Sequence, residues 1–151
     1  MKIALASDEK VNLLTDIQNY LAEKNIEVIN FYPQKVGDSL PFPDVATYAV
    51  GTIIKQICAQ AILLCWTGTG VCIAANKVPG IRAALCTDAE TAKGARRWND
   101  ANVLCLSTRL TSASLAKEIL SAWFASDYAA NLDNDACMAK LSALDTKRKY
   151  N

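Results

Sequence analysis

The sequence of 151 residues contains no histidine. Histidine is the side chain whose ordinary pKa lies closest to neutral pH, and it is a common general base and metal ligand. Its absence excludes a histidine general base, a Ser-His-Asp triad and a histidine-bound metal. Acid–base chemistry in this chain must therefore use Asp, Glu, Cys, Lys, Tyr or backbone groups.

An excess of charge of either sign is also missing, because 16 Lys and Arg stand against 15 Asp and Glu and give a net charge of +1. The body of the chain holds no basic cluster, so we expect no nucleic acid partner. No apolar run is long enough to span a membrane, and the first residues form a strand-like pattern in place of a secretory signal. We therefore expect no membrane association and a cytoplasmic location.

Close pairs of cysteine are lacking too, although the chain has six cysteines. No CxxC motif occurs, and most of the cysteines lie within apolar runs. In a cytoplasmic chain this pattern favours reduced thiols, and it argues against a zinc site. We expect no metal and no cofactor. Cys58, Cys86 and Cys105 are predicted to lie in the core, and so is Cys72, although it follows a glycine turn closely enough to approach a pocket.

Short apolar runs alternate with segments of helical periodicity along the whole chain, a pattern typical of a parallel sheet covered on both faces. We predict one α/β domain over residues 1–151 with a five-stranded parallel sheet. The last helix has little sheet left to cover and is expected to dock on a partner subunit. The predicted strands are 2–7, 26–31, 61–65, 81–86 and 102–106, and the predicted helices are 9–24, 44–60, 70–77, 89–98, 111–126 and 134–147.

Residues able to do chemistry follow the ends of these strands. Ligands of such folds bind beyond the carboxyl ends of the strands. Asp8 follows the first strand, Cys65 ends the third, Thr67 follows it, and Arg109 lies after the fifth. We therefore predict that Asp8, Cys65, Thr67 and Arg109 line one cleft.

A glycine turn separates Cys65 from the next predicted helix. Gly68 and Gly70 can adopt positive φ and let backbone N–H groups approach a ligand closely. The start of the following helix favours an anion, such as a phosphate or an enediolate, and it also favours a thiolate at Cys65. Such a thiolate could take a proton from a carbon beside a carbonyl. The residues alone leave a second interpretation open, in which the turn is structural and Cys65 is buried and inert.

Longer motifs extend this pattern: CWTGTG at 65–70, IAANKVPGIRAALC at 73–86 and NDANVLCL at 99–106. The opening Met1–Ala4, Ser7-Asp8, Pro43-Asp44 and Ala122-Trp123 fit the same order. Together they closely resemble the family of ribose-5-phosphate isomerase B and the galactose-6-phosphate isomerase subunits. The resemblance runs from the first residue to Tyr128.

This resemblance implies a Rossmann-like three-layer α/β/α fold and a homodimer or tetramer whose active sites lie between subunits. It implies cofactor-free aldose–ketose isomerisation of a small phosphorylated sugar, of the ribose-5-phosphate type, through an enediolate. Cys65 would be the base that moves the proton between C1 and C2, with Thr67 and Asp8 on the sugar hydroxyls. The implied substrate-binding residues are Gly68, Thr69, Gly70, Val71, Glu9, Trp98, Asn99 and Arg109.

Several positions depart from the family pattern around the implied site. Trp98 replaces the histidine that opens the furanose ring, and an indole has no basic lone pair to take that proton. The other departures are Glu9 for a histidine, Phe42 for a tyrosine, Trp66 for a glycine, and Leu132 and Ala136 for two phosphate-binding arginines. Three hypotheses follow: an isomerase with a short or acyclic substrate, a weak or inactive member that pairs with a paralogous subunit, or a binding protein for another small anion.

Overall fold

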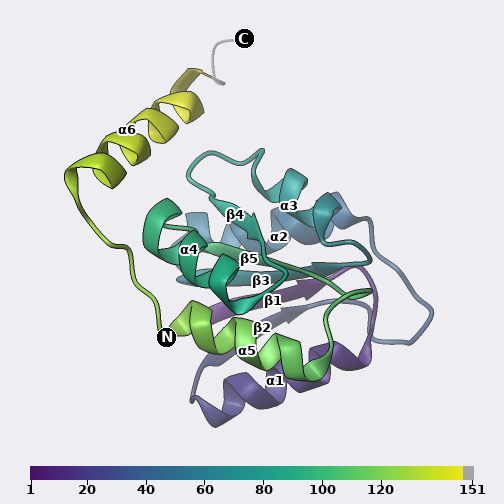
Figure 1. Cartoon of the computed structure of the whole chain (residues 1–151). Coiled ribbons are helices and arrows are strands. Elements are labelled where there is room, and N and C mark those ends of the chain that lie inside the picture. The colour runs from purple at the N-terminus through teal and green to yellow at the C-terminus, as the bar shows by residue number, and fades with distance from the viewer. Residues whose placement is uncertain (148–151) are drawn as a thin grey trace.

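The computed structural model describes residues 1–147, which form a three-layer α/β/α sandwich with a separate C-terminal helix (Figure 1). Within these residues the sheet has five strands, in the order β2-β1-β3-β5-β4, and every pairing is parallel. The predicted Rossmann-like fold is therefore confirmed. The strands are β1 (Lys2–Ser7), β2 (Glu27–Phe31), β3 (Gln60–Cys65), β4 (Ala83–Leu85) and β5 (Val103–Ser107).

Helices cover both faces of the sheet, because each central strand is apolar on both sides. In β1, Ile3 and Leu5 face the layer of α1, α4 and α5, whereas Ala4 and Ala6 face α2 and α3. The small side chains on the second face let α2 pack closely. The helices are α1 (Asn12–Glu23), α2 (Phe42–Ile54), α3 (Thr69–Ala75), α4 (Ala89–Asn99), α5 (Ala113–Phe124) and α6 (Leu132–Lys147).

Two predicted helix boundaries were wrong for local reasons. The second helix ends at Ile54 and not at residue 60, because Gln56 takes a φ of 58° and the N–H groups of Ile57 and Cys58 turn back to the Thr52 carbonyl. The first helix begins at Asn12 and not at residue 9, because Glu9 forms an isolated antiparallel bridge with Ser39. That bridge joins the end of β1 to the loop before α2.

The last helix, α6, stands away from the sheet (Figure 1). Its Asp145 carboxylate accepts a hydrogen bond from the Gly80 N–H at 2.8 Å, and Leu132 at its start is 90% exposed. Leu141 and Leu144 are also exposed. Docking of this helix on a partner subunit stays a prediction. Among the described residues, no helix is both long and apolar enough to cross a bilayer.

The strand order fixes where a ligand can enter. In the sheet, β2 lies on one side of β1, whereas β3, β5 and β4 lie on the other side. The order in which the chain adds strands therefore reverses its direction between β1 and β3. A crevice opens beyond the carboxyl ends of strands at such a point. Ser7 ends β1 and Cys65 ends β3, so the predicted residues Asp8 and Thr67 both begin loops at this crevice.

Candidate active site

The backbone of Asp8, at the end of β1, is held between β3 and the loop before α2. Its N–H donates to the Leu64 carbonyl at 3.4 Å, and its carbonyl accepts from the Leu40 N–H at 2.8 Å. Among the described residues, Oδ1 of Asp8 is a buried oxygen with no hydrogen-bond donor. Burial raises the pKa of Asp8 above its ordinary value, and the neighbouring charge of Glu9 raises it further. A buried acceptor without a donor points to a ligand hydroxyl that would complete it.

Cys65 ends β3 with its thiol reduced and only 5% of the residue exposed. Its carbonyl accepts two hydrogen bonds, from the Gly68 N–H at 3.1 Å and from the Thr108 N–H at 3.0 Å. The first bond closes the glycine turn, and the second ties the turn to the end of β5. The backbone that carries the thiol is therefore fixed from both sides.

Gly68 makes the turn possible. Its φ is +74°, and a Cβ there would lie 2.5 Å from Leu85 Cδ1 and 2.9 Å from the Leu106 carbonyl carbon. No other residue fits this site without moving the backbone. The expectation of positive φ was wrong for Gly70, which is absent from the positive-φ glycines of the described chain. Gly70 instead leaves room for the ring of Phe42, whose Cδ2 would lie 3.1 Å from an added Cβ.

The start of α3 presents backbone donors beside this turn. The Cys72 N–H makes the first helical bond, to the Gly68 carbonyl at 3.3 Å. The N–H groups of Thr69, Gly70 and Val71 therefore have no acceptor within the helix. Three neighbouring amides at a helix start favour an anionic oxygen.

Two hydroxyls and one cation lie on the exposed rim of the same loops. Thr67 Oγ1 and Thr69 Oγ1 are hydrogen-bonded at 2.6 Å, with either as donor. The Arg109 N–H donates to the Trp66 carbonyl at 3.1 Å, which fixes the start of that side chain beside the turn. Within residues 1–147, the Arg109 guanidinium forms no ion pair. No carboxylate among these residues therefore neutralises its charge.

Sequence reasoning missed Ser107, which joins these loops. Ser107 Oγ donates to the Trp66 carbonyl at 2.8 Å and accepts from the Leu110 N–H at 3.2 Å. It therefore connects the loop after β3 to the loop after β5. Its signal in the sequence was a polar residue at the end of an otherwise apolar strand.

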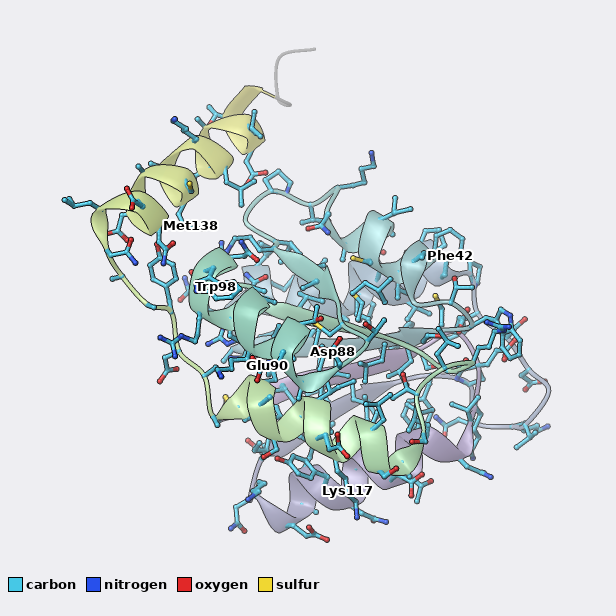
Figure 2. The ribbon with its side chains drawn as sticks, in the orientation of Figure 1. Phe42, Asp88, Glu90, Trp98, Lys117 and Met138 are labelled. Atoms are coloured by element: carbon cyan, nitrogen blue, oxygen red, sulfur yellow. The ribbon has the colours of Figure 1, made fainter. Side chains whose placement is uncertain are left out.

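Trp98 and Asn99 lie at the other end of the sheet. The C-terminal end of α4 leads into the amino end of β5, whereas Cys65 lies at the carboxyl end of β3. Asn99 lines a cavity of about 370 Å³ together with Arg82 and α6 residues. Trp98 packs on Gly94 and is 58% exposed, and Figure 2 shows it far from Phe42. Within one chain, Trp98 and Asn99 therefore lie apart from Cys65, and their place in a site between subunits stays a prediction.

The structure thus places Asp8, Glu9, Cys65, the 67–71 segment and Arg109 at or just after the carboxyl ends of β1, β3 and β5, and places Trp98 and Asn99 at the opposite end of the sheet. Phe42 reaches the same edge through its contact with Gly70. A buried thiol, a carboxylate with one oxygen that lacks a donor, helix-start amides and a guanidinium outside the ion pairs of the described residues together suit a small anionic polyol. No group of three or more Cys, Asp or Glu among the described residues is arranged to hold a metal ion.

Comparison with known proteins gives consistent matches over most of the chain. Residues 3–141 match the family model described as Ribose/Galactose Isomerase. D-erythrulose-4-phosphate isomerase of Pectobacterium atrosepticum is 41% identical over 130 residues, 85% of this chain and 85% of that protein. Ribose-5-phosphate isomerase B of Escherichia coli is 34% identical over 128 residues, 84% and 85% of the two chains. The structure of Clostridium thermocellum ribose-5-phosphate isomerase B matches with a TM-score of 0.91 and 34% identity, covering 100% of both chains.

Proposed function

The chain belongs to the ribose/galactose isomerase family and is an aldose–ketose isomerase of sugar phosphates, and we propose that Cys65 is the base that moves the proton. The observation that carries this proposal is the geometry at the end of β3. A fixed cysteine is followed by a turn that only glycine permits at residue 68, and then by the outward N–H groups of Thr69, Gly70 and Val71. The base and the anion-binding amides thus lie within one short segment, residues 65–71.

The chemistry follows from these two parts. Cys65, as the thiolate, takes the proton from C2 of the aldose, and the carbonyl oxygen gains negative charge as the enediolate forms. The amides of residues 69–71 stabilise that oxygen, because their dipoles are already aligned before charge develops. The proton returns from Cys65 to C1, and a proton passes between the two hydroxyl oxygens. The product is the ketose, and no redox cofactor is consumed.

The remaining crevice residues hold the substrate. Asp8 Oδ1 accepts a sugar hydroxyl, which supplies the hydrogen bond that it lacks among the described residues. The hydroxyls of Thr67 and Thr69 bind a second hydroxyl, and Glu9 lies beside Asp8 on the exposed rim. Arg109 binds the phosphate through charge-assisted hydrogen bonds.

We propose that the substrate is an open-chain sugar phosphate with four carbons. Ribose-5-phosphate closes to a furanose through O4, so its isomerase must open the ring. This chain has no histidine, and the indole of Trp98 cannot accept the ring proton. In a tetrose 4-phosphate, O4 is esterified, so no furanose forms and no ring-opening base is needed. The 41% identity to D-erythrulose-4-phosphate isomerase supports this substrate.

Ribose-5-phosphate is the second candidate substrate. It is favoured by the 34% identity to two ribose-5-phosphate isomerases B, one of which matches this fold over 100% of both chains. The open-chain form of ribose-5-phosphate would fit the same base and amides. The two substrates therefore differ in the need for ring opening, and not in the proton transfer.

We further propose a homodimer in which each crevice is completed by the second copy. Trp98 and Asn99 lie too far from Cys65 to act within one chain, and both are exposed. The exposed leucines of α6 offer an apolar surface for that copy. A Trp98 ring from the partner copy would exclude water from the crevice.

The experiment is an isomerase assay of the purified chain on D-erythrulose-4-phosphate, ribose-5-phosphate and galactose-6-phosphate, with Cys65→Ala. Cys58→Ala is the matched control, because Cys58 is also buried on the α2 and α3 face. Turnover of the four-carbon substrate that is lost in Cys65→Ala and kept in Cys58→Ala supports the proposal. Turnover only after a paralogous subunit is added would instead support the partner-subunit hypothesis. Sugar-phosphate binding without turnover, unchanged in Cys65→Ala, would support the anion-binding hypothesis.

A further inference from the structure

A second group of thiols lies on the same face of the sheet, one helical turn past the anion-binding amides. Cys72 is half-buried in α3, and Cys105 in β5 is fully buried beneath it, within the core formed with α2. Cys72 packs against the core cluster that contains Cys105, and each thiol shifts the pKa of the other. Cys72 Sγ also donates to the Ala83 carbonyl at 3.5 Å and accepts from Asn76 Nδ2 at 3.7 Å.

Only one of the two thiols is open to solvent. A surface hollow of about 230 Å³ is lined by Cys72, Ile73, Asn76 and Lys77. A small molecule can therefore reach Cys72 from outside, next to the Lys77 side chain. Cys105 is fully buried, so solvent does not reach it directly.

The more exposed thiol, Cys72, also has the lower pKa of the two. The hydrogen bond from Cys105 lowers the pKa of Cys72 to about 7, with help from the Leu85 N–H and Asn76 and against the effect of burial. Burial raises the pKa of Cys105 well above its ordinary value. Cys86, whose pKa burial raises to about 12, packs in the core on the other face of the sheet. Cys72 thus has thiolate character near neutral pH, while Cys105 stays protonated.

We propose that Cys72 and Cys105 form a peroxide-reactive thiol pair, separate from Cys65, that closes to a disulfide. The Cys72 thiolate attacks a hydroperoxide, which gives the sulfenic acid of Cys72 and releases an alkoxide or hydroxide. The Cys105 sulfur then attacks the Cys72 sulfur, a disulfide forms, and the sulfenic oxygen leaves as water with the Cys105 proton. The hydroperoxide is the two-electron oxidant, and a dithiol reductant restores both thiols.

This disulfide has a structural consequence for the crevice. Because the S–S bond is only about 2.05 Å long, we expect its closure to draw α3 toward β5. Cys72 follows directly after Val71, the last of the three anion-binding amides, and its own N–H closes the first turn of α3. Oxidation therefore displaces the amides that bind the enediolate, and we expect a reversible loss of turnover of about tenfold or more.

The test is peroxide titration of the reduced full chain, followed by alkylation of the remaining thiols. Combined trypsin and chymotrypsin cleavage places Cys72 in residues 67–77, apart from Cys58 and Cys65, and Cys105 in residues 99–109. The expected result is a cross-linked pair of these two peptides that a dithiol reverses. In Cys105→Ala, Cys72 has no resolving thiol, so a diketone probe should trap its sulfenic acid.

Two control variants separate this chemistry from general thiol reactivity. Cys137→Ser removes an exposed cysteine of α6, and Cys58→Ser removes a buried one, and both should leave the cross-link unchanged. Cys72→Ser should abolish the cross-link and keep basal turnover. The proposal is overturned if peroxide modifies Cys65 or Cys137 while Cys72 stays reduced, or if no 72–105 peptide forms. Since the cross-link is read by mass, its outcome is independent of whether Cys65 is the catalytic base.

Discussion

The ring of Phe42 lies against the backbone of Gly70, so closely that a Cβ on Gly70 would lie 3.1 Å from Cδ2 and 3.3 Å from Cε2 of the ring. Phe42 begins α2 and is 43% exposed, and Gly70 is the second residue of α3. The contact brings an apolar wall to the amides that bind the enediolate in our proposal. It also explains why a small residue stands at position 70, although the backbone there is ordinary helix.

Removal of this wall should change substrate choice more than stability. In Phe42→Ala the crevice widens beside Gly70, and the half-exposed ring contributes little to the core. We expect the ratio of kcat/KM for the four-carbon over the five-carbon sugar phosphate to fall by about tenfold. Steady-state kinetics on both substrates measure this ratio. An unchanged ratio would show that Phe42 does not bound the crevice.

Gly68 should tolerate no side chain. Gly68→Ala places a methyl group 2.5 Å from Leu85 Cδ1 and 2.9 Å from the Leu106 backbone, at a φ of +74°. We expect a loss of about 2–4 kcal/mol in the free energy of unfolding, from left-handed strain and overpacking together. Denaturant unfolding measures it. Gly51→Ala is the control, because a Cβ at this position in α2 meets nothing within 4 Å, and it should stabilise the helix by about 0.5–1 kcal/mol. Equal stabilities of the two variants would contradict the geometry of the turn.

The Asp8 carboxylate should lower the stability of the folded state at neutral pH, and in our proposal it also binds the substrate. Burial and the charge of Glu9 raise the pKa of Asp8, so the folded state binds this proton more tightly than the unfolded state does. The stabilisation from that proton is present at low pH and is lost as the pH rises through the raised pKa of the folded state. Asp8→Asn should therefore be more stable than the wild type at pH 7, with the difference vanishing in acid.

The same substitution should impair catalysis, because Asn has no negative charge to accept the substrate hydroxyl. Unfolding midpoints across pH and a parallel measurement of KM test both effects. Glu9→Gln provides a control, since it removes the neighbouring charge and leaves the buried oxygen in place. A wild type that is more stable than Asp8→Asn at pH 7 would contradict the burial of this carboxylate.

Arg109 should act on the phosphate. Its guanidinium has no ion-pair partner within residues 1–147, so its removal breaks no internal contact of that kind. Arg109→Ala should raise KM about 10- to 100-fold, the loss expected for one charge-assisted hydrogen bond, and leave the unfolding midpoint unchanged. Arg97→Ala, an exposed arginine at the far end of α4, should change neither value. Equal KM values for the two variants would show that Arg109 does not bind the phosphate.

The fold was predictable because continuous apolar runs alternate with helical segments, and the ends of β1 and β3 fell at Ser7 and Cys65 as expected. The early end of α2 was not predictable. Gln56 takes a left-handed backbone conformation there, and in a sequence only a glycine would have indicated that conformation. The proximity of Cys72 to Cys105 depends on which face of α3 packs against β5. The spacing of the cysteines along the sequence does not reveal that face. Trp98 was grouped with the site through the family resemblance, whereas the chain itself places it at the opposite end of the sheet. The extent of the domain and the cytoplasmic location stay predictions.

Isomerisation in deuterated water tests the central proposal most directly, since proton transfer through Cys65 lets solvent label C1 or C2 of the product. The measurement is NMR detection of deuterium in the product of D-erythrulose-4-phosphate, for wild type, Cys65→Ala and Cys58→Ala. Our account predicts labelled product with the wild type and with Cys58→Ala, and neither turnover nor label with Cys65→Ala. Turnover and labelling that persist at the wild-type rate in Cys65→Ala would contradict the assignment of Cys65 as the base.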